Sequence, residues 1–342
     1  MENREKVIRR IFDAYLNAEK RIEIDSCVLN EKIWRFMKKH RLDMIFCDLL
    51  SEKENVPSSV QEYYLNIKQK QNRMTNVVYE LVNKLRDVQC VFLKGVPLSM
   101  LLYREKYHRL YHDIDILVER KTINKIEERL FELGYQYGYE YKGKIYSPSR
   151  KEIITKQLYS HECYEMVKIH DNDLISYVDI NFLFSWIAPD ESRSISGKIV
   201  QDIFRENAIK RGDICILSWE YMFVHLCCHF YNEAHFLETD LDYNKERDQN
   251  IILIRLMDIL LVLNEHMDFE KVKKIVQSIM CENKIGYVLH CVEELLGYNY
   301  KWLMDYLGCE LNDEIINSYY SSEGKLCYFT NTIAERVYGE ID

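Results

Sequence analysis

Hydrophobic residues are spaced for helices at both ends of the chain and for strands between them. In the N-terminal region they recur every three or four positions over residues 4–18, 31–39 and 63–85, which predicts three helices. Ser59 precedes the third pattern and is a candidate N-cap. From Val91 the period changes to two, which is typical of strands.

The alternating region predicts a small mixed α/β unit. It opens with a strand from Val91 to a Lys94-Gly95 turn, followed by a short helix and a strand that ends at Val118. A helix over residues 121–133 comes next, with Gly134 at its C-cap position. Further strands are expected at residues 135–146, 153–169 and 174–184.

Helical spacing returns after Pro189. Residues 238–249 are charged and aperiodic, which fits either a lid or a plain solvated loop. The sequence therefore predicts an α+β fold, with N-terminal helices at 1–89, a mixed-sheet core at 90–190 and a C-terminal helical bundle at 191–342. The helices expected in that bundle cover residues 218–233, 251–265, 269–281 and 285–296.

Composition narrows the class of protein. The 342-residue chain is 47% hydrophobic and 30% charged, which is ordinary for a globular protein. Its formal charge of −9, without a dense Lys/Arg run, disfavours long nucleic acid as a partner. No window is apolar enough to span a membrane, and the 11 scattered cysteines without CxxC spacing indicate reduced thiols. We therefore expect a cytoplasmic protein.

Two carboxylates one residue apart mark the strand that ends at Val118. Side chains alternate along a strand, so Asp113 and Asp115 point to one face and Ile114 to the other. Asp-x-Asp also occurs at ordinary surface turns, but here a third acid, Asp179, lies in another strand pattern. Three convergent carboxylates suit Mg2+ and phosphoryl transfer, with two ions or with an ion and a base. Asp179 could complete the metal site or accept a proton.

Cationic residues precede the acids. Lys94-Gly95 offers a cation and a backbone that phosphates can approach closely, or merely a tight turn between strand and helix. Arg109 lies four residues before Asp113 and could contact a phosphate oxygen or brace its loop by pairing with a carboxylate. The sequence leaves both interpretations open for each position.

A histidine pair lies in the C-terminal region. His225 and His229 are four residues apart and therefore share a helical face. This spacing suits zinc, but zinc needs three or four ligands, and no Glu directly follows His225 as in a metalloprotease motif. Arg255 and Asp258 lie three apart on the next expected helix, so the four residues could form a polar seam between helices or line an acceptor pocket.

Together these motifs resemble the uncharacterised nucleotidyltransferase family of the polymerase-β-like superfamily. The resemblance covers residues 30–300 and includes the histidine pair and the Arg-x-x-Asp of the helical half. The residues that carry it in the α/β half are Leu93-Lys-Gly95, Arg109, Asp113-Ile-Asp115, Leu133-Gly-Tyr135, His161-Glu162 and Val178-Asp-Ile180.

Two departures accompany the resemblance. Superfamily members usually carry Gly-Ser after the first strand, where this chain has Lys94-Gly95. The family commonly has a histidine two residues after the third acid, where this chain has Asn181. Asparagine cannot act as a base, so any catalytic role of that histidine is lost or moved.

The resemblance implies Mg2+-dependent transfer of a nucleoside monophosphate from an NTP, by default ATP, with release of pyrophosphate. The implied acceptor is a hydroxyl or amine of a small molecule, peptide or protein, and His161 is implied in nucleotide binding. Three alternatives remain: a toxin-like transferase acting on tRNA or protein, a catalytically degenerate nucleotide-binding protein, and a metal hydrolase that uses the histidine pair.

Overall fold

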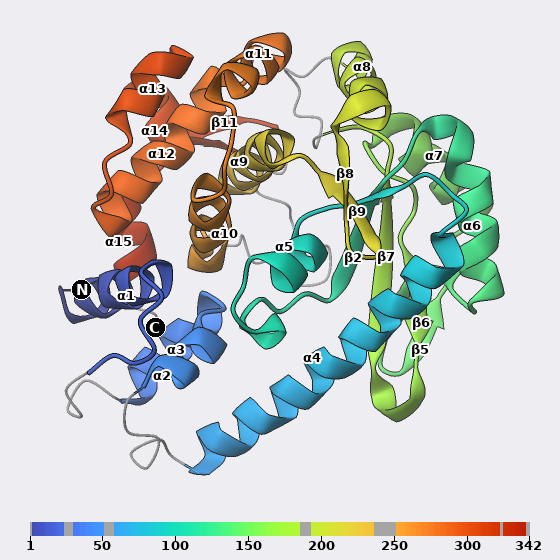
Figure 1. Cartoon of the computed structure of the whole chain (residues 1–342), viewed down its shortest axis with the longest axis horizontal. Helices are drawn as coiled ribbons and strands as arrows, with labels where there is room; N and C mark the ends of the chain where they lie inside the picture. The colour runs from blue at the N-terminus through green and yellow to red at the C-terminus, as the bar shows by residue number, and fades with distance from the viewer. Residues whose placement is uncertain are drawn as a thin grey trace. The chain divides into compact units, whose positions relative to one another are not determined.

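The structure is a computed structural model that describes residues 2–23, 30–50, 58–184, 193–235, 251–321 and 324–339. The chain divides into two compact units, one of residues Glu62–Met222 and the other of Met1–Gln61 with Phe223–Asp342. Figure 1 shows the sheet of the first unit and the helices of both. The α+β class expected from the sequence is confirmed.

The unit of residues 62–222 is built on a seven-stranded mixed sheet of order β3-β6-β7-β2-β1-β9-β8. Neighbours β2 and β7 run parallel, as do β1 and β9, and the other pairs are antiparallel. The strands are β1 (Val91–Phe92), β2 (Asp113–Leu117), β3 (Gln136–Tyr137), β6 (Met166–Ile169), β7 (Ile175–Asn181), β8 (Ala208–Arg211) and β9 (Ile214–Leu217).

Alternation along the two central strands separates an apolar face from a polar one. Ile114 and Ile116 of β2 are buried, as are Val178 and Ile180 of β7. The acids stand between these residues in the sequence, so they emerge on the opposite face of the sheet. Burial of the aliphatic face therefore fixes the direction of the acids.

Helices and a small hairpin complete this unit. The hairpin is formed by β4 (Tyr139–Tyr141) and β5 (Lys144–Tyr146). The helices are α5 (Gly95–Leu101), α6 (Ile123–Glu132), α7 (Arg150–Tyr159), α8 (Arg193–Asp202) and most of α4 (Ser58–Leu85), with single turns at Lys106–His108, Arg120–Thr122, Asp171–Asp173 and Ile203–Asn207.

Several expected elements differ in the structure. The strand expected at 153–169 is wrong, because α7 occupies its first part and only β6 is extended. The strand expected at 135–146 is broken into β3, β4 and β5. Ser59 lies inside α4, which already begins at Ser58, so it is not the N-cap. Gly134 does follow the last turn of α6 with a positive φ of 88°, as a C-terminal glycine should.

The other unit is mainly helical and confirms the helices expected at both ends of the chain. Its core includes the fully buried rings of Phe12, Phe36 and Tyr338, and α12 packs against α1, α13 and α15. The helix α3 was not expected from the sequence. The elements are α1 (Glu2–Leu16), α2 (Glu31–Lys39), α3 (Asp43–Leu49), most of α9 (Trp219–His235), α10 (Leu253–Leu263), α11 (Phe269–Ile279), α12 (Glu282–Leu296), α13 (Lys301–Leu307), α14 (Asp313–Asn317), β10 (Ser318–Tyr320), β11 (Leu326–Tyr328) and α15 (Ile333–Tyr338).

The sheet extends beyond residue 190, because β8 and β9 join it next to β1. The division at 1–89, 90–190 and 191–342 stays a prediction about folding domains. The charged segment 238–249, considered above as a lid or a loop, lies outside the described residues. Within the described part of the chain, no helix is long and apolar enough to cross a membrane.

Candidate active site

The strand register brings three carboxylates onto one face of the sheet. Asp115 of β2 lies directly opposite Asp179 of β7, and Asp113 lies opposite Tyr177. Neighbouring strands are about 4.8 Å apart, and residues two apart on one strand share a face. Asp113, Asp115 and Asp179 therefore lie side by side, although they come from segments more than sixty residues apart in the chain.

This crowding changes the acidity of Asp179. Burial raises the pKa of its carboxyl well above the ordinary value, and the negative charges of Asp115, Glu162 and Asp113 raise it further. The Lys94 ammonium acts in the opposite direction. Asp179 consequently holds a proton far more readily than an aspartate in water.

Lys94 supplies the cation closest to the acids. Its Nζ lies 2.7 Å from Oδ1 of Asp115. The residue sits between β1 and α5 with φ 48° and ψ −117°, a conformation that costs a non-glycine residue about 1–3 kcal/mol. Backbone strain of this size persists only where surrounding structure enforces it, and here it aims an ammonium at the acidic face.

Gly95 and Arg109 shape the segments around that turn. A Cβ on Gly95 would lie 2.8 Å from Cβ of Tyr111, so only glycine lets the start of α5 approach this loop. Arg109 is buried, and its Nη1 donates a hydrogen bond of 2.7 Å to the carbonyl oxygen of Leu110. Arg109 therefore braces the backbone just before β2.

A second polar group, not recognised as a whole in the sequence, borders the acids. Lys156 of α7 lies 2.7 Å from Oε1 of Glu162, and His161 Nε2 lies 3.5 Å from Oε2 of the same carboxylate. Glu162 forms an isolated antiparallel bridge with Asn181 of β7. Burial lowers the pKa of His161, which favours its neutral form.

Glu165 is a further acid that the sequence reading missed. Burial, followed by the charge of Asp113, raises the pKa of its carboxyl to about 7. Lys156 opposes this shift and also feels the charges of Asp179 and Glu165. Glu165 lies just before β6, inside the strand expected at 153–169, and nothing in that pattern places it beside Asp113.

The donor chemistry of this face fits a divalent cation. Carboxylate oxygens are the ligands that Mg2+ prefers, and mutual repulsion of the acids is relieved by positive charge. Among the residues that the structure describes, no three His, Cys, Asp or Glu side chains are arranged to hold one ion. Mg2+ commonly needs only one or two carboxylates together with substrate phosphates, a requirement that Asp113 and Asp115 meet.

The histidine pair lies in the other unit. Glu233, which the motifs did not single out, links it to the next helix. Glu233 accepts a hydrogen bond of 2.7 Å from Nη2 of Arg255 and lies 3.4 Å from Nε2 of His229. The rings of His225 and His229 are parallel with centroids 6.4 Å apart, and Asp258 is buried. Glu233 follows His229 by one helical turn, a spacing that could have identified it.

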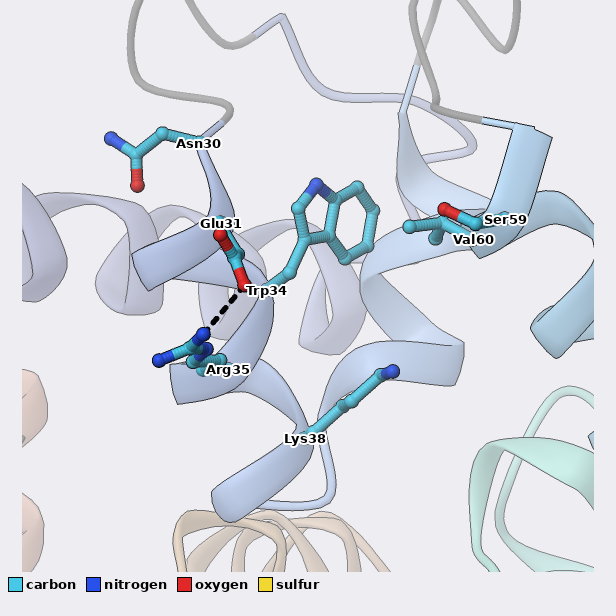
Figure 2. A pocket seen from close by; sticks show the side chains of 7 residues that line it. All are labelled: Asn30, Glu31, Trp34, Arg35, Lys38, Ser59 and Val60. Carbon is cyan, nitrogen blue, oxygen red and sulfur yellow. Dashed lines mark hydrogen bonds and ion pairs between the residues drawn. The ribbon is translucent and has the colours of Figure 1, made fainter.

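This unit also has a pocket of about 420 Å³ between α2 and the first turn of α4 (Figure 2). An ion pair of 2.6 Å joins Glu31 and Arg35 at its rim, and the Trp34 indole forms part of its wall. None of the sequence-predicted site residues lines this pocket.

The sequence matches a model of a protein family. A family model described as uncharacterised nucleotidyltransferase matches residues 27–297, which is most of the chain and includes all of the site residues above. No curated protein matches the sequence. The resemblance recognised from the motifs is thereby confirmed.

Proposed function

The chain belongs to the uncharacterised nucleotidyltransferase family, and on that premise we propose that it transfers a nucleoside monophosphate from an NTP, with ATP as donor, to a hydroxyl or amine. The reaction releases pyrophosphate and depends on Mg2+. The pairing of Asp115 with Asp179 across two parallel strands, with Lys94 on Asp115, is the observation that carries this proposal.

In the proposed reaction, Asp113 and Asp115 hold the Mg2+ ions, two in the full complex, with Asp179 as a further ligand or as the base. Mg2+ held by these acids would supply positive charge to offset that of the triphosphate. The acids share one sheet face, so a cation held there interacts with more than one carboxylate.

The bonding changes balance without a further reactant. The acceptor oxygen or nitrogen forms a bond to the α-phosphorus, and the bond from that phosphorus to the bridging oxygen of pyrophosphate breaks. The acceptor proton passes to Asp179, which lies directly opposite Asp115 on the same sheet face. Asn181, which replaces the family's usual histidine, cannot perform this step.

Cations around the acids are suited to the triphosphate. Lys94, which pairs with Asp115, can instead contact a phosphate oxygen of the bound triphosphate. His161, close to Glu162, contributes a neutral imidazole to the nucleotide site. Gly95 and Arg109 set the turn and the loop from which Lys94 and the acids project. His225, His229, Arg255 and Asp258 stay a predicted acceptor pocket.

Calorimetry of NTP binding, with and without Mg2+, tests the proposal. We expect Mg2+-dependent binding to the full chain and a loss of at least about tenfold in affinity in Asp113→Asn/Asp115→Asn. A matched control is Asp171→Asn/Asp173→Asn, because these two acids repeat the Asp-x-Asp spacing in a turn that leads into β7. Failure of every NTP to bind the folded chain would refute the transferase proposal.

Lys94→Met tests the cation in the same assay. Lys168→Met is its control, because the two lysine side chains are 20% and 21% exposed and both pair with an acid. We expect NTP affinity to fall about tenfold or more in Lys94→Met and to stay within about twofold in Lys168→Met. Equal effects of the two variants would exclude a specific phosphate contact by Lys94.

A further inference from the structure

The hairpin of β4 and β5 presents an aromatic face to solvent. Tyr139 pairs with Tyr146 across the hairpin, and Tyr141 pairs with Lys144, so all four side chains share one face. The three tyrosines are 48%, 47% and 45% exposed in the order 139, 146 and 141. The rings of Tyr139 and Tyr146 stack with centroids 5.7 Å apart and planes 15° apart. Three adjacent exposed aromatic rings form a contiguous patch of the kind that marks interaction sites.

The backbone holds this face in a fixed conformation. Lys142 and Gly143 form the two-residue turn with φ of 52° and 76°, as the tightest hairpin connection requires. Gly138 has φ 140°, and a Cβ there would lie 2.3 Å from the carbonyl oxygen of Tyr146. The chain therefore keeps a glycine where the two ends of the hairpin meet.

Local charge around the hairpin is opposite to that of the whole chain. Residues 139–159 contain five Lys or Arg and two Glu, a formal charge of +3 in a chain of −9. Lys142 lies 4.9 Å from the ring centroid of Tyr141. In the part of the chain that the structure describes, no ion pair engages Lys142, Lys144, Arg150 or Lys151. We call Tyr139, Tyr141, Lys142, Lys144 and Tyr146 the hairpin patch.

Helix α7 extends this surface from the end of the hairpin. None of its residues is buried, and Leu158 and Tyr159 are 58% and 80% exposed. Lys151, Lys156 and Tyr159 help to line an open hollow of about 550 Å³. The surface therefore combines cations with exposed apolar and aromatic groups over two consecutive elements.

The hairpin patch is attached directly to the acidic face. The amide of Gly138 donates a hydrogen bond of 3.1 Å to the carbonyl oxygen of Glu165, whose carboxyl feels the charge of Asp113. The phenol of Tyr177, opposite Asp113 in the sheet, bonds to the backbone of Glu140. The backbone of the hairpin is therefore bonded to the segments that carry Glu165 and Tyr177, next to the acids.

We propose that the hairpin patch, with α7, docks the end of a single-stranded nucleic acid whose terminal hydroxyl is the acceptor. This proposal rests on the proposed function. Stacked tyrosines offer π faces to bases, and the unpaired cations offer contacts to phosphates, a combination that binds single strands with little sequence preference. The hydroxyl oxygen bonds to the α-phosphorus, pyrophosphate leaves, and the proton passes to Asp179.

Single-stranded nucleic acid fits the hairpin patch better than the other polyanions. An acidic peptide would use the cations but has no bases to stack on three exposed tyrosines. A long duplex buries its bases, and the chain's −9 charge would repel its extended phosphate backbone. The net charge of −9 disfavours binding of long nucleic acid, but it does not exclude binding of a short single strand at this local positive charge.

Fluorescence anisotropy with a labelled 12-nucleotide RNA, at low salt and without NTP, tests the proposal on the full chain. We expect Lys142→Glu/Lys144→Glu to weaken binding at least about tenfold and to reduce its salt dependence. Tyr141→Ala should weaken binding about fivefold or more, whereas Tyr141→Phe, which keeps the ring, should bind within about twofold of the parent. The control is Lys210→Glu/Arg211→Glu, which reverses two exposed cations on β8 of the same unit.

The outcomes separate this proposal from the proposed function. Asp113→Asn/Asp115→Asn should lose NTP binding but keep RNA binding. A failure of nucleotide transfer would therefore count against the proposed function and not against RNA binding by the hairpin patch. The proposal would be overturned if the chain did not bind RNA, or if the β8 control lost as much affinity as Lys142→Glu/Lys144→Glu. It would also be overturned if poly-glutamate displaced the labelled RNA as well as unlabelled RNA does and Tyr141→Ala had no effect. Circular dichroism confirms that each variant is folded.

Discussion

At the scale of single residues, environment separates carboxylates of the same chemical type. Asp115 has an ammonium 2.7 Å away, whereas the pKa of Asp179 is raised by burial and by its neighbours' charges. Carboxylates in different environments can perform different tasks. Here Asp115 suits a cation and Asp179 suits a proton, a distinction that the spacing of the three acids in the sequence does not contain.

Glu165 gives this argument a measurable pH dependence. Its pKa of about 7 in the folded chain lies above the ordinary glutamate value of 4.5. The folded state therefore binds the proton more tightly, and this contribution to stability is complete below pH 4.5 and is lost as pH rises through about 7. We expect Glu165→Gln to raise the free energy of unfolding by about 1 kcal/mol at pH 8, after allowance for solvent screening, and to change it little at pH 4.5.

Urea titrations at the two pH values measure this difference. Glu128→Gln, a substitution on the exposed surface of α6, is the control and should give no pH-dependent gain. A destabilisation by Glu165→Gln at pH 8 would mean that the charged carboxylate is favourable where it lies, contrary to the repulsion by Asp113 inferred here.

At the scale of elements, a helix without a buried stripe shows one way in which sequence-based prediction fails. The sequence predicts a strand where α7 lies, because Ile153, Ile154 and Thr155 are β-branched and no residue of the helix is buried. Its capping box, in which Ser149 and Glu152 exchange hydrogen bonds, was present in the sequence as a start signal. Lys156 was missed as a consequence, since a strand would have aimed it differently.

The turn from β1 into α5 permits a test of why Gly95 is required. Gly95→Ala would bring a Cβ within 2.8 Å of Tyr111 Cβ, so Lys94 or the loop before β2 must shift. We expect a loss of about 1–3 kcal/mol in the free energy of unfolding and weaker NTP binding. Gly197→Ala in α8 is the contrasting variant, because its Cβ meets nothing within 4 Å, and we expect a gain of up to about 1 kcal/mol. Chemical denaturation compares the two, and equal effects would remove the steric argument.

At the scale of the whole molecule, the sequence predicted the fold class and the acids but not the full sheet. The expected strands at 91, 113–118 and 174–184 correspond to β1, β2 and β7, because long apolar alternation identifies buried strands. Strands β8 and β9 were missed because each has only four residues, and β9 joins the sheet by pairing with β1, which is distant in the sequence. Likewise Glu165 is recognised beside the acids only in the folded chain.

The position of β9 predicts how the sheet unit folds when it is isolated. Ile214, Ile216 and Leu217 are almost fully buried, and β9 covers the edge of β1. A fragment that ends at residue 190 lacks these three side chains and the apolar burial they provide. That burial stabilises the fold by roughly 5–9 kcal/mol, which is comparable to the net stability of a domain. We therefore expect a fragment of residues 62–222 to melt cooperatively by circular dichroism, and a fragment of residues 62–190 to show no cooperative transition.

Ile216→Ala in the longer fragment should give an intermediate result, with a loss of about 2–4 kcal/mol in the free energy of unfolding. Cooperative melting of the shorter fragment would instead support a core that ends near residue 190, the boundary expected from the sequence, with β8 and β9 as an addition to it.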